Sequence, residues 1–197
     1  MSRIRECLFG EDSWNGTRLL TFVLLLGAPE VIERVLAVVN GHPVLLSEVR
    51  TLATLRGLSE DKARDALIDE RLMFDQASRV PQAAVSSAEE DTAYHHLLER
   101  RPELATLVPE AESRRVVRRE AAILKYVEFR FSPQVRVTDD DLRRVYAQEY
   151  GGQPEAPPFD VVAEALRERA VRRELDRKIE AWVQELRAAA EIRIVSP

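Results

Sequence analysis

The chain carries the stretch VLAVVNGHPVLLSEV at residues 35–49, and this stretch decides how the rest is organised. It reads as two short apolar strands on either side of Asn40-Gly41, followed at once by the start of a helix. Asn-Gly favours a two-residue hairpin turn, because both central positions of a type I′ turn need positive φ. A lone hairpin is marginally stable in water, so it needs a third strand or a helix against it.

One other segment has the pattern of a strand. Residues 191–195, at the far end of the sequence, alternate strictly between polar and apolar side chains. We therefore expect the two ends to meet in one small sheet, with the helices between them as a closed excursion. In that arrangement, a charged residue in place of Ile194 should weaken the fold more than any change in residues 151–158.

The composition favours a mostly α fold. Of the 197 residues, 45% are hydrophobic and 32% are charged, and glycine occurs only 7 times. That balance supports a real core and long solvated helices rather than a β-rich fold. The net charge of −5 disfavours a nucleic-acid partner. The single cysteine, Cys7, excludes an internal disulfide and a cysteine metal cluster.

Apolar periodicity and capping residues predict the helices. Ser47 is expected to cap the first helix, and Ser87 with Glu90 to form a capping box for the third. The expected helices cover residues 47–55, 60–78, 87–100, 110–131, 138–150 and 159–190. The last contains no Gly or Pro and would extend about 45–50 Å, so we expect the other helices to lie along it. Trp182 is expected in the core under the sheet.

Residues 1–30 have the character of a signal-like or poorly ordered N-terminal segment. Residues 19–26 are apolar, follow Arg18 and are too few to span a bilayer as a helix. Gly27-Ala28 come next, as after the apolar region of a signal peptide. We therefore expect a periplasmic or otherwise exported protein, with no stable membrane span beyond this segment. The alternative is a buried first helix.

Four segments, taken in order, resemble a known family. They are the hairpin at 35–49, ALIDERL at 66–72, VTDDDLRRVY at 137–146, and residues 179–195. As an ordered set they resemble the SurA-type and PrsA-type periplasmic chaperones. The resemblance implies a SurA N-terminal-like helical chaperone domain, here residues 31–197, whose last strand pairs near the N-terminal hairpin. It also implies binding of unfolded, apolar-rich polypeptides in the cell envelope.

The sequence departs from that family at residues 151–158. In SurA-like and PrsA-like proteins, a whole parvulin prolyl isomerase domain lies between the helix that 138–150 resembles and the closing helix. Here the Gly/Pro-rich segment 151–158 has the length of an ordinary loop. It reads as a linker where the parvulin domain would be inserted, so we expect no isomerase module and no enzyme.

No residue pattern indicates a catalytic site, a cofactor site or a metal site, and we predict none of them. His42 lies at the predicted turn, while His95 and His96 are neighbours on a helix and point away from each other. The arginines at 114–119 and 167–177 are interleaved with acids. That pattern favours pairs on solvated helix surfaces over a polyanion site.

The functional prediction is a surface that binds apolar peptide segments. A groove between helices, lined with apolar side chains that the core leaves free, would hold such segments. The candidate peptide-binding residues are Tyr94, Leu97, Leu98, Leu104, Leu107, Tyr126, Phe129 and Phe131.

The sequence therefore predicts an ATP-independent holdase chaperone for unfolded or nascent polypeptides of exported or outer-membrane proteins. Two alternatives stay open: a prolyl isomerase of the parvulin-associated family, and an assembly factor dedicated to one envelope partner. Proline isomerisation on a model peptide and the number of co-purifying clients separate the three. The sequence sets no oligomeric state.

Overall fold

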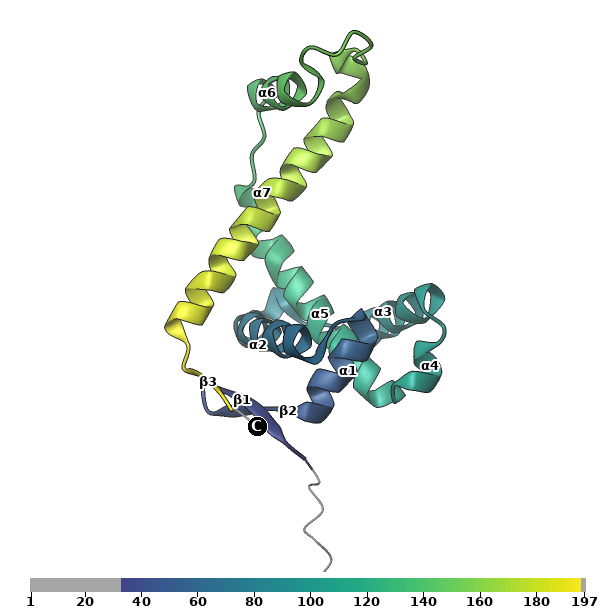
Figure 1. The fold of residues 1–197 in the computed structure, drawn as a ribbon, viewed down its shortest axis with the longest axis vertical. Helices are drawn as coiled ribbons and strands as arrows, with labels where there is room; N and C mark the ends of the chain where they lie inside the picture. Colours follow the sequence, from purple (N-terminus) through teal and green to yellow (C-terminus); the bar gives the residue numbers. More distant parts are fainter. Residues whose placement is uncertain (1–32, 196–197) are drawn as a thin grey trace, which may run out of the picture. The chain divides into compact units, whose positions relative to one another are not determined.

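The computed structural model describes residues 33–195, so the predicted signal-like segment 1–30 lies outside the described residues. Within this range the protein is mostly α-helical with one small antiparallel sheet, which confirms the predicted fold class (Figure 1). Single 3₁₀ turns occupy Pro81–Ala83 and Ser132–Gln134. The other elements are β1 (Val35–Val39), β2 (His42–Leu45), α1 (Leu46–Arg56), α2 (Glu60–Ala77), α3 (Ser87–Arg100), α4 (Leu104–Leu107), α5 (Glu110–Phe131), α6 (Asp139–Tyr150), α7 (Phe159–Ala189) and β3 (Ile192–Ile194).

The sheet has the strand order β2-β1-β3, so the last strand lies antiparallel to the first. The turn between β1 and β2 has positive φ at Asn40 (48°) and Gly41 (81°), as the Asn-Gly pair predicts. Asn40 also holds β3. Its N–H donates to the carbonyl of Glu191 at 2.9 Å, and its Oδ1 accepts from the N–H of Glu191 at 3.0 Å. The first and last strands are thus tied at the turn, as predicted.

Within β3, Ile192 makes the core contact that was expected of Ile194. Ile192 is partly buried against the hydrophobic cluster under the sheet, whereas Ile194 is 47% exposed. A charge at position 194 would reach solvent. We therefore expect a charged residue to destabilise the fold strongly at Ile192 and not at Ile194. Within residues 151–158, Gly151 is less tolerant of substitution than expected, because a Cβ there would lie 2.1 Å from the carbonyl oxygen of Ala147.

Capping residues set the starts of α3 and α6. A box of Thr138 and Asp141 opens α6, the helix expected over residues 138–150. At α3 the box is formed by Ser86 and Glu89, one residue before the predicted pair. Lys125 of α5 donates to the Glu89 carboxylate at 2.7 Å. This contact with α5 favours Glu89 over its neighbour and ties the start of α3 to α5.

The start of α1 differs from the prediction, because Ser47 does not cap it. Leu45 occupies the N-cap position, and its N–H donates to the carboxylate of Glu48 at 2.9 Å. The hydroxyl of Ser47 instead donates to Glu33 at 2.5 Å. Gly57 ends α1 with a φ of 67°, in the left-handed region that glycine adopts readily.

Two hydrophobic clusters form the core. The first lies between the sheet, α1, α2, α4 and the start of α5, and the second joins the ends of α2 and α5 to α7. Trp182 belongs to the second cluster rather than lying under the sheet. It stacks on Tyr126 and packs against Phe131, with ring centroids 5.2 Å and 5.4 Å away. It lies about seven residues before the end of α7, roughly 10 Å of helix, and so packs away from the sheet.

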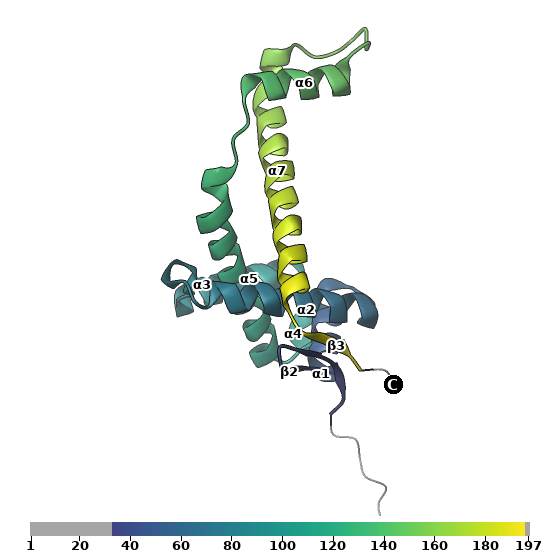
Figure 2. The ribbon, with the colours of Figure 1, turned by 90° about the vertical axis from the view of Figure 1, so that its left-hand side faces the viewer.

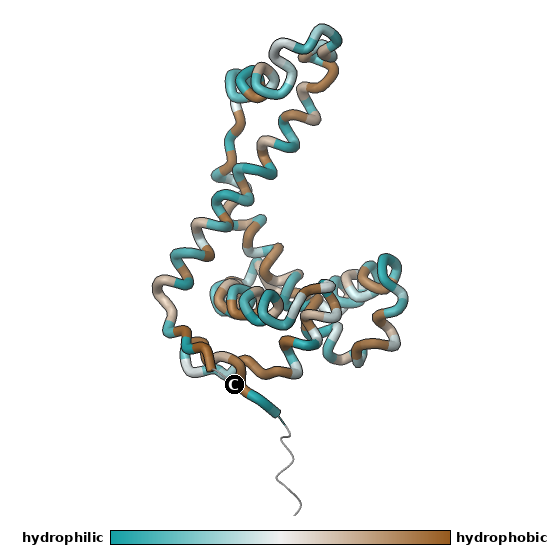
Figure 3. Tube along the Cα trace, in the orientation of Figure 1, coloured by the Kyte–Doolittle hydropathy of each residue, from teal (hydrophilic) through white to brown (hydrophobic). Residues whose placement is uncertain are grey.

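Helix α7 serves as the long element along which other helices lie. Its 31 residues extend about 46 Å at 1.5 Å per residue. It contacts α6 through its N-terminal part and α2 and α5 through its C-terminal part (Figures 1 and 2). Hydrophobic residues recur along it between hydrophilic ones (Figure 3). At its start, the hydroxyl of Tyr146 on α6 donates to the carbonyl of Pro157 at 2.6 Å and fixes the loop 151–158.

Replacing Asn40 by Gly should keep the turn, because glycine adopts positive φ readily, but should remove the acceptor for the N–H of Glu191. We expect the free energy of unfolding to fall by about 1–2 kcal/mol, from one lost hydrogen bond and the added backbone freedom. Asn40→Asp keeps the acceptor and should change that free energy by less than about 0.5 kcal/mol. Urea unfolding measures both variants. Equal stability of Asn40→Gly and the wild type would contradict the role of Asn40 in holding β3.

The pKa of Glu89 is lowered to about 2, first by the hydrogen bond from Lys125 and then by those from Ser86. The ionised carboxylate therefore stabilises the fold above its ordinary pKa of 4.5, and this contribution is lost as the pH falls from 4.5 towards 2. The unfolding free energies of the wild type and Glu89→Gln should differ most at neutral pH and converge in acid. Urea unfolding at about pH 7, 5 and 3 tests this. A difference that stays constant across the three conditions would count against it.

Candidate functional site

The eight predicted binding residues do not form one surface. Leu107 and Phe129 are well exposed, at 61% and 53%, but nearly the whole length of α5, roughly 30 Å, separates them. Two others are partly buried against the first cluster: Leu97 and Leu98. The remaining four are core residues, each at most 7% exposed: Tyr94, Leu104, Tyr126 and Phe131. These four offer no free surface to a ligand.

Packing partners from distant segments account for this burial. Tyr126 and Phe131 face Trp182 of α7, which covers the end of α5. The guanidinium of Arg114 lies 4.6 Å from the ring centroid of Tyr94 and covers that ring. An apolar helix face in a sequence does not reveal which partner covers it.

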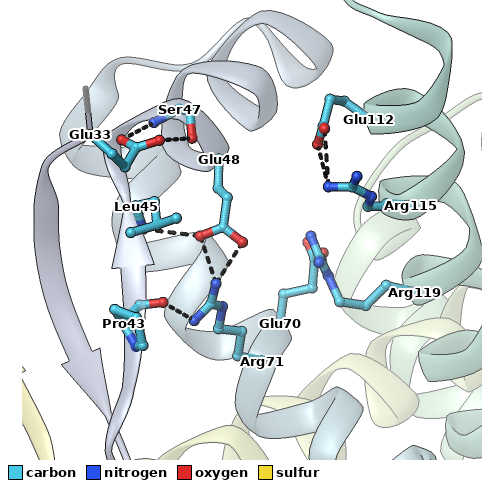
Figure 4. Close-up of polar contacts among 10 residues, drawn as sticks. All are labelled: Glu33, Pro43, Leu45, Ser47, Glu48, Glu70, Arg71, Glu112, Arg115 and Arg119. Carbon is cyan, nitrogen blue, oxygen red and sulfur yellow. Dashed lines mark hydrogen bonds and ion pairs between the residues drawn. The ribbon is translucent and has the colours of Figure 1, made fainter.

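A buried acid joins three helices beside the hairpin. Glu70 of α2 is 2% exposed, and its carboxylate accepts from Arg56 of α1 at 2.6 Å and from Arg119 of α5. Arg56 also donates to Glu120 of α5 at 2.5 Å. Two guanidinium groups thus compensate a carboxylate whose burial would otherwise be costly. In Figure 4, Glu70 and Arg119 point toward each other, and Arg71 and Glu48 lie between them and the hairpin.

The next residue, Arg71, fixes the hairpin to α2. It donates to both carboxylate oxygens of Glu48, each at 2.6 Å, and to the backbone carbonyl of Pro43 (Figure 4). Asp69, on the other side of Glu70 in the sequence, accepts from Arg187 of α7. Successive residues of a helix point about 100° apart, so these three neighbours reach three sides of α2. Each one ties a different part of the fold to this helix.

Beside Arg71 the surface is hollowed into a groove of about 700 Å³. It lies between the turn end of the hairpin, the C-terminal half of α2, and α5. Its apolar lining consists of Val39, Pro43, Leu72 and Phe74. Its polar lining consists of Asn40, His42, Arg71, Asp75, Ser78, Arg79 and Arg119.

A second hollow of about 300 Å³ continues the first, because Phe74, Ser78 and Arg79 line both. It runs on to the 3₁₀ turn and to Arg118 and Ala122 of α5. Its further apolar lining is Ala77, Val80, Pro81, Ala83, Ala84 and Val85. We call the two hollows together the α2 groove. The volume of each hollow lies within the range found for small-ligand sites.

Ion pairs hold the arginines at the rim of the α2 groove. Arg79 donates to Asp75, one turn earlier on α2, at 2.6 Å. Arg118 donates to Glu90 of α3 at 3.0 Å. A guanidinium has five N–H donors, so each arginine keeps donors beyond those that its acid uses. The groove therefore combines an apolar floor with a rim of positioned hydrogen-bond donors.

The arginine-rich helix surfaces form the pairs that the sequence predicts. Arg115 pairs with Glu112 at 3.0 Å, and Arg177 with Glu174 at 2.6 Å, each three residues apart on one helix. Exposed pairs of this kind contribute little energy but keep a helix surface solvated.

The histidines do not come together. His42 lies at the hairpin turn, with Nδ1 3.1 Å from the carbonyl oxygen of Asn40, while His95 and His96 lie on α3. Within residues 33–195, no three His, Cys, Asp or Glu side chains are grouped so that they could hold a metal ion. None of the helices in the described range is long and apolar enough to cross a membrane.

Replacing Glu70 by Ala would leave Arg56 and Arg119 without their buried acceptor. We expect this to lower the free energy of unfolding by about 3–5 kcal/mol. Glu120→Ala removes a half-exposed partner of Arg56 and should cost less than about 1 kcal/mol. Denaturant unfolding compares the two. Similar losses of unfolding free energy for both variants would show that the buried Glu70 stabilises the fold no more than the half-exposed Glu120.

Comparisons with known proteins give no assignment for this site: neither protein-family models nor curated proteins match the sequence. The α2 groove is the strongest candidate for a binding site, because it is large and partly apolar and because ion pairs hold the arginines that line it.

Proposed function

We propose that the protein is an ATP-independent holdase chaperone for unfolded, apolar segments of exported or outer-membrane proteins. It acts by binding alone, without a cofactor or a covalent step. The observation that carries this proposal is the α2 groove, with its apolar floor and arginine rim.

The two parts of the groove suit the two parts of an unfolded chain. Phe74 and Val80, which are partly exposed, offer apolar surface to client side chains, and burial yields about 25 cal/mol per Å². Arg79 and Arg118 offer N–H donors to client backbone carbonyls, which every sequence possesses. Recognition of this kind depends on apolar content rather than on an exact sequence, as a holdase requires.

The arrangement of the strands also supports the proposal. β3 pairs antiparallel with β1, which is the feature that the resemblance to SurA-type chaperones predicts. The loop 151–158 joins α6 directly to α7, and Tyr146 fixes it through Pro157. The proposal therefore includes the chaperone activity of that family and its envelope location, but not isomerase activity.

The test is suppression of aggregation. An unfolded outer-membrane protein is diluted from urea with and without the full chain, and light scattering is followed. Stoichiometric excess of the protein should suppress the scattering. No suppression would remove the chaperone proposal.

Ser78→Trp tests the location of the site. Ser78 is exposed and lines both hollows, so a bulky side chain there should fill the middle of the groove. We expect at least about five times more of this variant to be needed for equal suppression, which corresponds to ~1 kcal/mol. The matched control is Ser87→Trp, at an exposed position on α3 outside the groove. Equal activity of the two variants would place client binding elsewhere.

A further inference from the structure

The sheet has two edge strands, and the edge of β2 is closed by the protein itself. Pro43 has no N–H to offer, and its carbonyl accepts from Arg71 (Figure 4). The N–H of Leu45 donates to Glu48 at 2.9 Å. Residues 43 and 45 turn these groups away from β1, since alternate residues of an antiparallel pair face the partner strand. Proline and charged side chains at an edge prevent pairing with another chain.

The edge of β3 is open. The carbonyl of Glu191 and the N–H of Val195 both bond to β1, each at 2.9 Å. By alternation Arg193 also faces β1, while Ile192 and Ile194 turn their N–H and carbonyl groups outward. Within the part of the chain that the structure describes, no hydrogen bond engages these four outward groups. β3 therefore offers the donors and acceptors that another strand needs.

We propose that β3 pairs with β3 of a second copy of this chain, antiparallel about a two-fold axis at Ile192. In this register, Ile192 and the partner's Ile192 exchange both backbone hydrogen bonds. A two-fold interface needs only one self-complementary patch, because each copy presents the same residues to the other. The pairing would join the two sheets into one six-stranded sheet.

Charge selects this register. Glu191 and Arg193 are exposed and lie on the same face of β3, two residues apart. With the axis at Ile192, each Glu191 lies opposite the partner's Arg193, which gives two pairs of opposite charge. An axis at Arg193 would place two arginines opposite each other, and like charges directly opposite are destabilising. The strand is thus self-complementary in charge when centred on Ile192.

Apolar side chains add to the contact without making it strong. Ile194 and Val195 beside the open edge are 47% and 38% exposed, and in this register they lie opposite the end of the second copy's α7, which would cover part of them. The edge is only three residues long, so few hydrogen bonds form. We expect a reversible dimer with a dissociation constant on the order of 0.1 mM. This interface lies apart from the client-binding proposal, because no residue of β3 lines the α2 groove.

Analytical ultracentrifugation of the full chain tests the proposal. Measurements should run from about tenfold below to about tenfold above the expected dissociation constant. The average mass of the wild type should rise from that of one chain towards that of two. A mass that stays at one chain throughout would overturn the proposal.

Two charge variants test the register. Glu191→Arg gives the face two positive charges, and Arg193→Glu gives it two negative charges, so each variant alone opposes like charges. Each should weaken dimerisation by at least about tenfold. An equimolar mixture of the two variants restores both opposite-charge pairs and should recover the dimer. Thermal melts of each variant verify folding, which is expected because both side chains are exposed. Unchanged dimerisation in the single variants, or no recovery in the mixture, would overturn the proposal.

Discussion

The fold depends on the reciprocal hydrogen bonds between Asn40 and Glu191, which join residues 151 positions apart. These bonds close the chain segment between the two residues into one long loop that contains all the helices of the described range. Closing so long a loop costs entropy, but the cost grows only with the logarithm of the length. The pairing of β1 with β3 and the ion pair between Asp69 and Arg187 add to the closure. With its C-terminal end held at the sheet, α7 lies against both α2 and α5.

Most of the helices and the hairpin were predictable, because their signals are local. The bounds of α5 match the prediction to the residue, and those of α7 match within one. The capping residues were less predictable where two candidates are neighbours. Ser86 and Ser87 both suit an N-cap, and Lys125, far away in sequence, favours the box that contains Glu89. Ser47 lost its expected role because Glu33 accepts its hydroxyl.

The candidate site could not be predicted, because contacts between distant segments build it. The α2 groove combines the hairpin turn with α2 and α5, and no local pattern connects them. Residues 69–71 are only a charged run in the sequence, and the packing of α2 decides which partner each one reaches. Likewise, Tyr126 and Phe131 would show the same periodicity on an open face, and the position of Trp182 decides that they are buried.

The strand order has a consequence for synthesis of the chain. β1 receives β2 from the adjacent hairpin, but its other neighbour, β3, is made about 150 residues later, which takes roughly 8–30 s at 5–20 residues per second. Throughout that interval the nascent protein presents one unpaired edge of β1. The opposite edge of the hairpin is already blocked once Arg71 has been added. Until β3 is added, wrong pairing of the hairpin is therefore possible only at the edge of β1 that β3 later occupies.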